Sequence, residues 1–226
     1  MQRADPFVVD EYYHIYNRGI DKKVIFQTER DHQRFVALLY ISNTKESFRL
    51  DNIINQQKKR LNEVFQIDRG DTLVDIGAWC LMPNHFHILI REKTEGGISK
   101  FMLKLSTAYS MYFNIKRKRT GALLCRPFKS ILIKNDNYLR HLFGYIHLNP
   151  IDLKFKDWKE KIKRDKKETN EMKIFLNSYK YSSYLDYFRE ERIENKILST
   201  KKFPEYFLGV HEFMDFIEDY LSTEEE

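Results

Sequence analysis

Two histidines stand one residue apart, at His85 and His87, at the start of the apolar run HFHILI. Alternate side chains of a β-strand point to the same face, so both imidazoles face one way and Phe86 faces the other. Strand geometry separates the two rings by about 7 Å, which allows both to bind one divalent metal ion. Two ligands are too few, so others must come from elsewhere in the chain. The alternative is an ordinary pair of hydrogen-bonded strand histidines.

A second group of reactive side chains lies in the segment FGYIHLNP, where a helix is expected to end before Pro150. Tyr145 and Asn149 are four residues apart and share one helix face, and His141 is on that face one turn earlier. A phenol beside a metal or a basic group can act as a nucleophile. The amide oxygen of Asn149 could bind the same metal. The alternative is a half-buried tyrosine and an asparagine that caps the helix.

Other aromatic and imidazole side chains compete for these roles. Tyr109 and Tyr112 are rival nucleophiles, but their helical spacing on an apolar face favours a place in the core. His14 is expected on the first strand, where we interpret it as a structural or supporting residue rather than a ligand. His147 is two residues from Tyr145 and therefore points away from its face.

Basic side chains are candidates for binding nucleic-acid phosphates. The net charge is +6, from 39 Lys and Arg against 33 Asp and Glu, and the clustering of these residues is more informative than the modest excess. A locally basic surface suits a polyanion, although solvated surface charge is the alternative. The candidates are Arg18, Lys116, Arg117, Lys118, Arg119, Arg126 and Lys129.

The composition limits the class of protein. The chain has 226 residues, of which 42% are hydrophobic and 15% aromatic, so one substantial domain with a packed core is expected. No apolar run approaches the roughly 20 residues of a membrane-spanning helix, and the N-terminus lacks the apolar segment of a signal peptide. Cys80 and Cys125 are the only cysteines and have no metal-type spacing. A cytoplasmic, reduced protein is therefore expected, with no membrane partner.

The pattern of apolar residues predicts how these side chains are positioned. Strands are expected over residues 9–17, 72–81, 85–91 and 126–134, and helices after Thr28, over 98–119 and from Asp136 to about Leu148. This order predicts an α+β fold of the ferredoxin-like split βαβ type: a four-stranded antiparallel sheet with helices on one face, plus a C-terminal helical extension. We expect one domain over residues 8–152, with an insertion at about 46–71, and a basic linker and helical extension over 153–226.

Five segments resemble the motifs of one known family. They are YHIYNRG at 13–19, MPNHFH at 82–87, GALLCRPFKS at 121–130, YIHLNP at 145–150 and YSSY at 181–184. In their order and spacing they resemble the REP-associated tyrosine transposase group of the single-tyrosine HUH transposases, related to insertion-sequence transposases that move as single strands. The resemblance covers roughly residues 10–187. Pro127 is an extra residue in the third motif, and the 46–71 insertion is longer than the group leads us to expect.

The resemblance implies a catalytic domain over 8–152 and assigns roles within it. Tyr145 would be the nucleophile, and His85, His87 and Asn149 would bind Mg²⁺ or Mn²⁺. The implied activity is that of a metal-dependent endonuclease and strand transferase. Such an enzyme cleaves and rejoins single-stranded DNA with hairpin or repeat structure through a 5′-phosphotyrosine intermediate. Relatives include dimers and monomers, so a homodimer is one expected state.

Two other functions stay open at this point. One is a non-catalytic, domesticated nucleic-acid-binding protein that retains the scaffold, although binding alone needs none of the four residues His85, His87, Tyr145 and Asn149. The other is a metal-dependent hydrolase of another kind, in which water rather than a tyrosine is the nucleophile.

Overall fold

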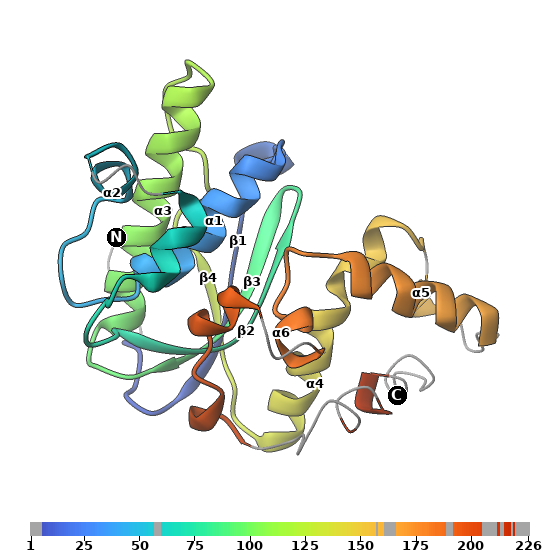
Figure 1. The fold of residues 1–226 in the computed structure, drawn as a ribbon. Helices are drawn as coiled ribbons and strands as arrows, with labels where there is room; N and C mark the ends of the chain where they lie inside the picture. Colours follow the sequence, from blue (N-terminus) through green and yellow to red (C-terminus); the bar gives the residue numbers. More distant parts are fainter. Residues whose placement is uncertain are drawn as a thin grey trace.

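The structure is a computed structural model that describes residues 6–56, 60–156, 158–160, 166–188, 192–204, 212, 215–217 and 219. Its centre is an antiparallel sheet whose strands follow the order β2-β3-β1-β4. The strands are β1 (Tyr12–Arg18), β2 (Val74–Met82), β3 (His85–Glu92) and β4 (Lys129–Leu132). The predicted α+β, ferredoxin-like fold is confirmed (Figure 1).

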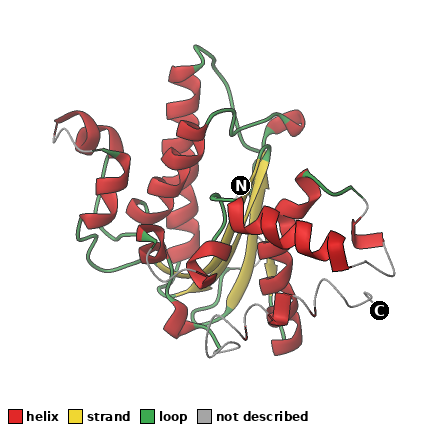
Figure 2. Ribbon diagram, turned by 45° about the vertical axis from the view of Figure 1, so that its right-hand side comes forward, coloured by secondary structure: helices red, strands yellow, loops and turns green. Residues whose placement is uncertain are grey.

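Helices cover both faces of this sheet. The two crossover helices, α1 (Glu29–Ile41) and α3 (Gly97–Lys116), lie on one face, as expected, with α2 (Leu50–Gln56) beside them. The other side carries α4 (Asp136–Leu148), α5 (Lys166–Ser178) and α6 (Tyr184–Phe188), and Figure 2 shows the sheet between the two groups. Short 3-10 helices span Ile20–Lys22, Leu61–Gln66, Asn149–Leu153, Trp158–Glu160, Ile193–Ile197 and Thr200–Lys202. None of the described helices has the length and apolarity needed to cross a membrane.

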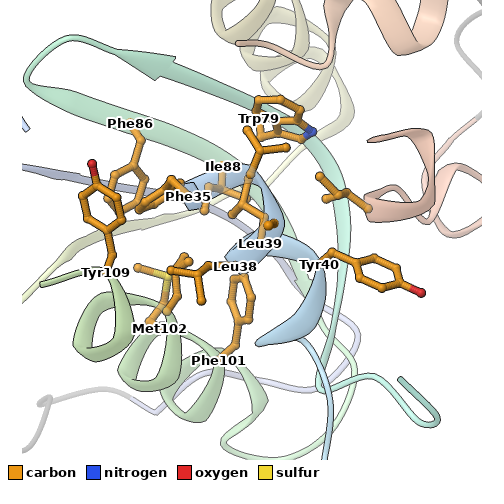
Figure 3. Packing of buried hydrophobic residues seen from close by; sticks show 14 of the residues in the cluster. Phe35, Leu38, Leu39, Tyr40, Trp79, Phe86, Ile88, Phe101, Met102 and Tyr109 are labelled. Atoms are coloured by element: carbon orange, nitrogen blue, oxygen red, sulfur yellow. The ribbon is translucent and has the colours of Figure 1, made fainter. Parts of the chain in front are cut away.

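The face under α1 and α3 is a continuous hydrophobic core. Phe86 and Ile88 of β3 meet Phe35 of α1 and Tyr109 of α3, and the rings of Phe35 and Phe86 lie 4.9 Å apart (Figure 3). The helix α1 starts directly after Thr28, as predicted, because the Thr28 hydroxyl accepts a hydrogen bond from the Asp31 backbone while the Asp31 carboxylate accepts one from the Thr28 backbone. Strand alternation therefore selects the side chains of this core, and the Thr28 cap fixes where α1 begins.

The opposite face is buried by α4 and by the C-terminal extension. A bulge at Gly77 of β2 shifts the alternation of the strand, so that Ala78, Cys80 and Met82 join the core under α4. Met172 of α5 and other apolar residues of the extension complete this second core. The extension is thus packed onto the sheet, while the boundary at residue 152 stays a prediction.

The YSSY motif closes the free edge of β2. The Leu81 amide donates to the Tyr181 carbonyl at 2.9 Å, and the Ser183 amide donates to the Trp79 carbonyl at 2.9 Å. The Ser183 hydroxyl accepts from the Trp79 amide at 2.9 Å. Because an exposed edge strand leaves backbone groups unpaired, the motif has a structural role here.

Several predicted boundaries differ from the structure. The fourth strand is shorter than the expected 126–134, since it pairs with β1 only over Lys129–Leu132. The expected helix from Asp136 is α4, and its cap is Asn135, because the Asn135 side chain accepts a hydrogen bond from the Tyr138 amide. The 46–71 insertion contains α2 and the 3-10 helix Leu61–Gln66. Part of the expected basic linker and helical extension, including residues 161–165, 205–211 and 220–226, lies outside the described residues.

Candidate active site

The two histidines of β3 lie on the face of the sheet that α4 covers. The register pairs His87 with Cys80 of β2 and with Tyr16 of β1. The rings of Tyr16 and His14 lie on the same face of the sheet as the His87 ring. His85 and His87 have ring centroids 5.0 Å apart. His87 is buried and His85 is half-buried. The structure therefore brings both imidazoles together, as the alternation predicted.

Each imidazole is held by a neighbouring side chain through its Nδ1 atom. His85 Nδ1 lies 2.6 Å from Asn84 Oδ1, and the Asn84 amide nitrogen donates to the Lys22 carbonyl at 3.2 Å. Asn84 therefore presents its oxygen to His85, which puts the proton on His85 Nδ1 and leaves Nε2 as a free acceptor. His87 Nδ1 lies 2.8 Å from His14 Nε2. When His87 donates in this pair, its Nε2 is also a free acceptor.

Tyr145 and Asn149 approach the same imidazoles from α4. The Tyr145 ring lies 5.5 Å from the His87 ring and 6.1 Å from the His14 ring, edge-on to both. Asn149 is buried, and its side chain lies close enough to His85 to raise the pKa of that imidazole. Its amide nitrogen also donates to the Tyr145 carbonyl at 3.2 Å, so Asn149 caps the end of α4 as well. The phenol and the two histidines belong to the same chain, without exchange of a helix.

Burial keeps the imidazoles of this site neutral at physiological pH. It lowers the pKa of His14 to about 4. The pKa of His87 is well below the usual value, chiefly through burial and further through His14, His85 and Lys159. The pKa of His85 is also lowered, mainly by burial, with Arg18 adding to the effect and Asp152 opposing it. Neutral imidazole is the form that binds metal ions.

Lys159 from the C-terminal extension reaches this site. Its Nζ lies 5.2 Å from the centre of the Tyr145 ring, and its charge acts on both His85 and His87. The Asp152 carboxylate holds it through an ion pair of 3.0 Å and also accepts a hydrogen bond from the Trp158 indole. Lys159 therefore adds a positive charge beside the tyrosine.

The donor set fits a divalent metal ion that accepts both nitrogen and oxygen ligands. His85 and His87 each have Nε2 available, and the Asn149 amide supplies an oxygen beside them. Imidazole suits Mn²⁺ better than Mg²⁺, which prefers oxygen ligands. Over the described part of the chain no three His, Cys, Asp or Glu side chains form a metal-binding group. An ion here would therefore depend on the amide and on oxygen atoms from a substrate or water.

Comparison with known proteins agrees with this arrangement. A family model described as "Transposase IS200 like" matches residues 44–149. Over these residues, slightly less than half of the chain, the sequence is similar to the IS200-like transposase family. The match contains His85, His87, Tyr145 and Asn149, and it confirms the predicted resemblance to this group of transposases over residues 44–149.

A solved structure from the group named in the sequence analysis is also similar. It is described as a REP-associated tyrosine transposase bound to a REP hairpin, and it is 12% identical to this chain. The match covers 86% of this chain and 90% of that one, with a TM-score of 0.49. A search of curated proteins finds no similar sequence.

Two of the seven basic residues predicted to bind DNA lie at the site. Arg18 of β1 pairs with His85 in the register and acts electrostatically on it. Lys129 of β4 pairs with Tyr16, which itself pairs with His87, so the Lys129 side chain points to the same face. Both are exposed and suitably placed for phosphate oxygens.

The remaining basic residues lie elsewhere. Lys116 and Arg117 form ion pairs with buried Asp31, at 2.6 and 3.1 Å, which gives them a structural role. Arg119 donates to the Asn114 side chain and the Ala122 carbonyl. Lys118 and Arg126 are exposed. Phosphate binding by these five stays a prediction.

The tyrosines that could compete with Tyr145 as the nucleophile have structural roles. Tyr109 is fully buried, its hydroxyl donates to the Ile25 carbonyl, and burial raises its pKa. The Tyr112 hydroxyl donates to the Asp31 carboxylate at 2.9 Å. The interpretation of both as core residues is confirmed. His147 faces away from Tyr145 and bonds to the Ser183 hydroxyl, while His141 is exposed.

The sequence analysis missed the direct contact of His14 with His87 and the whole contribution of Lys159. Each lies outside the 44–149 family match. The signal for His14 was its place in the first-strand motif, at a position whose side chain shares the His87 face. Nothing in the lysine-rich segment around Lys159 distinguishes that residue from its neighbours.

Proposed function

We propose that this protein is an IS200-like transposase of the REP-associated type and that it cleaves and rejoins single-stranded DNA with hairpin or repeat structure. The observation that carries the proposal is the Tyr145 ring, 5.5 Å from His87 within one chain, beside a pair of neutral imidazoles. Binding alone requires no such pairing. The hairpin in the substrate is inferred from the sequence motifs shared with the group.

In the proposed reaction the Tyr145 hydroxyl oxygen attacks the scissile phosphorus. An oxygen–phosphorus bond forms, the bond to the 3′-oxygen breaks, the phenolic proton is lost, and the 3′-oxygen gains a proton. One phosphodiester replaces another, so a 3′-OH can reverse the step and join DNA without ATP. Asn149 caps the helix end next to Tyr145 and so helps to orient it.

The chain's own residues also prepare the site for an anionic phosphate. His85, His87 and Asn149 would hold Mg²⁺ or Mn²⁺, which would polarise a phosphoryl oxygen. His14 and Asn84 orient the two imidazoles. The positive charges of Arg18 and Lys159 would attract the anionic phosphate oxygens.

A covalent adduct assay tests the proposal. Labelled single-stranded hairpins are incubated with the protein and Mn²⁺, and adducts are resolved on a denaturing gel. Tyr145→Phe is expected to abolish the adduct and to retain DNA binding. Tyr138→Phe is the matched control, because Tyr138 is a half-buried tyrosine two turns earlier on the same helix.

The same assay separates the alternatives. Cleavage without an adduct would indicate a hydrolase with water as nucleophile. Binding of hairpins with neither cleavage nor adduct would indicate a domesticated binding protein. An adduct that persists in Tyr145→Phe would mean that another residue is the nucleophile. A homodimer remains a prediction, and all the site residues described above come from one chain.

A further inference from the structure

A cavity of about 750 Å³ lies on the α1 side of the sheet, away from Tyr145. One wall is the first half of α1, including Arg30 and Gln33. The second wall is the 46–71 insertion, including Arg60 and Asn62, and the third is the Lys180–Tyr181 segment at the edge of β2. The insertion, which departs from the expected family pattern, therefore forms part of a concave site.

Three cations from three different segments line this cavity. Arg30, Arg60 and Lys180 are exposed, and none of them forms an ion pair with a residue in the described part of the chain. Arg34, which also lines it, is different because it pairs with Asp51 at 2.5 Å. Cations gathered from separate elements around one hollow suit a phosphate-bearing ligand.

An aromatic side chain in the same cavity is fixed in place. The Tyr181 ring stacks on the His32 ring of α1, with centroids 3.8 Å apart and planes 17° from parallel. The Tyr181 carbonyl accepts from the Leu81 amide, which anchors its backbone to β2. A rigid aromatic wall beside cations is a common arrangement for contact with an unpaired base.

The remaining polar groups suit the edge of a base rather than a bare phosphate. Gln33 and Asn62 carry amides that both donate and accept, and the carboxylates of Glu29 and Glu194 accept hydrogen bonds from exocyclic amino groups. The volume lies within the range of pockets that hold small molecules. A free phosphate would not need the amides or the carboxylates.

We propose that this cavity binds one nucleotide of a single-stranded segment of the DNA substrate. This inference rests on the proposed function for its ligand, and it gives the 46–71 insertion a role in DNA recognition. The cavity borders the edge of β2, and that strand pairs with His87 through Cys80. A strand that passes around this edge can therefore contact both the cavity and the active site.

The test uses Tyr145→Phe protein, so that binding is measured without cleavage. Arg30→Ala with Lys180→Ala removes two exposed cations, and we expect the Kd for a labelled single-stranded hairpin to rise at least 10-fold. The slope of log K against log salt should fall by about 1.4, since each phosphate contact to single-stranded DNA contributes about 0.7. Lys100→Ala with Lys201→Ala removes the same charge from exposed positions outside the cavity and should change neither quantity.

A second measurement is independent of the proposed transposase activity. Calorimetric titration with the four deoxynucleoside 5′-monophosphates should detect binding that Arg30→Ala with Lys180→Ala abolishes. Asn62→Ala should change the ranking of the four bases and leave the salt slope unaltered. Equal Kd and equal salt slope for the cavity and control pairs would overturn the inference, whether or not an adduct forms. Absence of an adduct with intact nucleotide binding would overturn only the proposed function.

Discussion

The two faces of β3 are built on different principles. Phe86, Ile88 and Ile90 point into the core under α1 and α3 and are fully buried. His85 and His87 point to the face under α4, where His85 contacts the adjacent Asn84 side chain and His87 contacts His14 of β1. One strand therefore separates a packed hydrophobic layer from a polar site by alternation alone.

The difference shows what each face requires of its neighbours. A hydrophobic face needs partners of suitable size and shape, and many combinations of apolar residues meet that need. A buried polar face needs a donor or an acceptor at a particular atom. Replacement of a residue should therefore affect stability on the first face and chemistry on the second.

The largest effect is expected from Phe86→Ala. Its ring packs against Phe35, and truncation of a fully buried phenylalanine leaves a cavity that costs about 3–5 kcal/mol of unfolding free energy. Denaturant unfolding measures the change, and Phe86→Leu should lose clearly less. A loss below about 1 kcal/mol for Phe86→Ala would contradict the packing described for this face.

His87→Ala should mainly reduce metal binding and cleavage. Residues that only orient a ligand typically change metal affinity 10- to 100-fold, so loss of a ligand should lower Mn²⁺ affinity at least about 100-fold. Calorimetric titration measures the affinity, and the adduct assay measures cleavage. His141→Ala is the control, because His141 is an exposed histidine of α4. Unchanged Mn²⁺ affinity in His87→Ala would rule out the metal site.

A smaller effect on the same face is expected from His14→Ala. Loss of the 2.8 Å contact frees the His87 ring to rotate and to exchange tautomers, so Mn²⁺ affinity should fall about 10- to 100-fold. His14→Gln should recover part of the affinity, because its amide can still accept from His87 Nδ1. If His14→Ala binds Mn²⁺ as the unmodified protein does, His14 is only a packing residue.

Residue spacing within single strands and helices was enough to predict much of the fold and the main residues of the candidate site. Alternation in HFHILI predicted which side chains share a face, and the four-residue spacing of Tyr145 and Asn149 predicted a common helix face. Both predictions depend on geometry within one element. The two-face arrangement of the helices was not predicted, since the amphipathic pattern of α4 does not reveal which side of the sheet it covers.

The missed features arise between elements far apart in the chain. His14 and His87 are 73 positions apart, and Lys159 reaches Tyr145 only because Asp152 and Trp158 fix its position. The bulge at Gly77 reverses the alternation of β2, which the run TLVDIGAWCL does not indicate. Lys116 and Arg117 were predicted to face DNA, and no local signal marks Asp31 as their buried partner.

The smallest effect is expected in the pH dependence of the unfolding free energy, which tests the buried polar groups on the α4 side of the sheet. His147 is fully buried, and burial lowers its pKa to about 3, while the Phe143 backbone opposes this shift more weakly. In the unfolded chain it would bind a proton near pH 6.5. Between these values the unfolded state binds more protons, so stability rises with pH, by up to about 1.4 kcal/mol per pH unit for each such histidine. His14 contributes with the same sign down to about pH 4.

Denaturant unfolding between pH 4 and 6 should therefore give a shallower slope for His147→Gln than for the unmodified protein. Asp186 supplies a control of opposite sign. Burial raises its pKa to about 7, so its folded form retains a proton that the unfolded form loses, and stability falls as pH rises from about 3.8 to 7. Asp186→Asn should make the rise between pH 4 and 6 steeper. Equal slopes in all three proteins would mean that His147 and Asp186 titrate in the folded state as they do in water, and that the face under α4 is open to solvent.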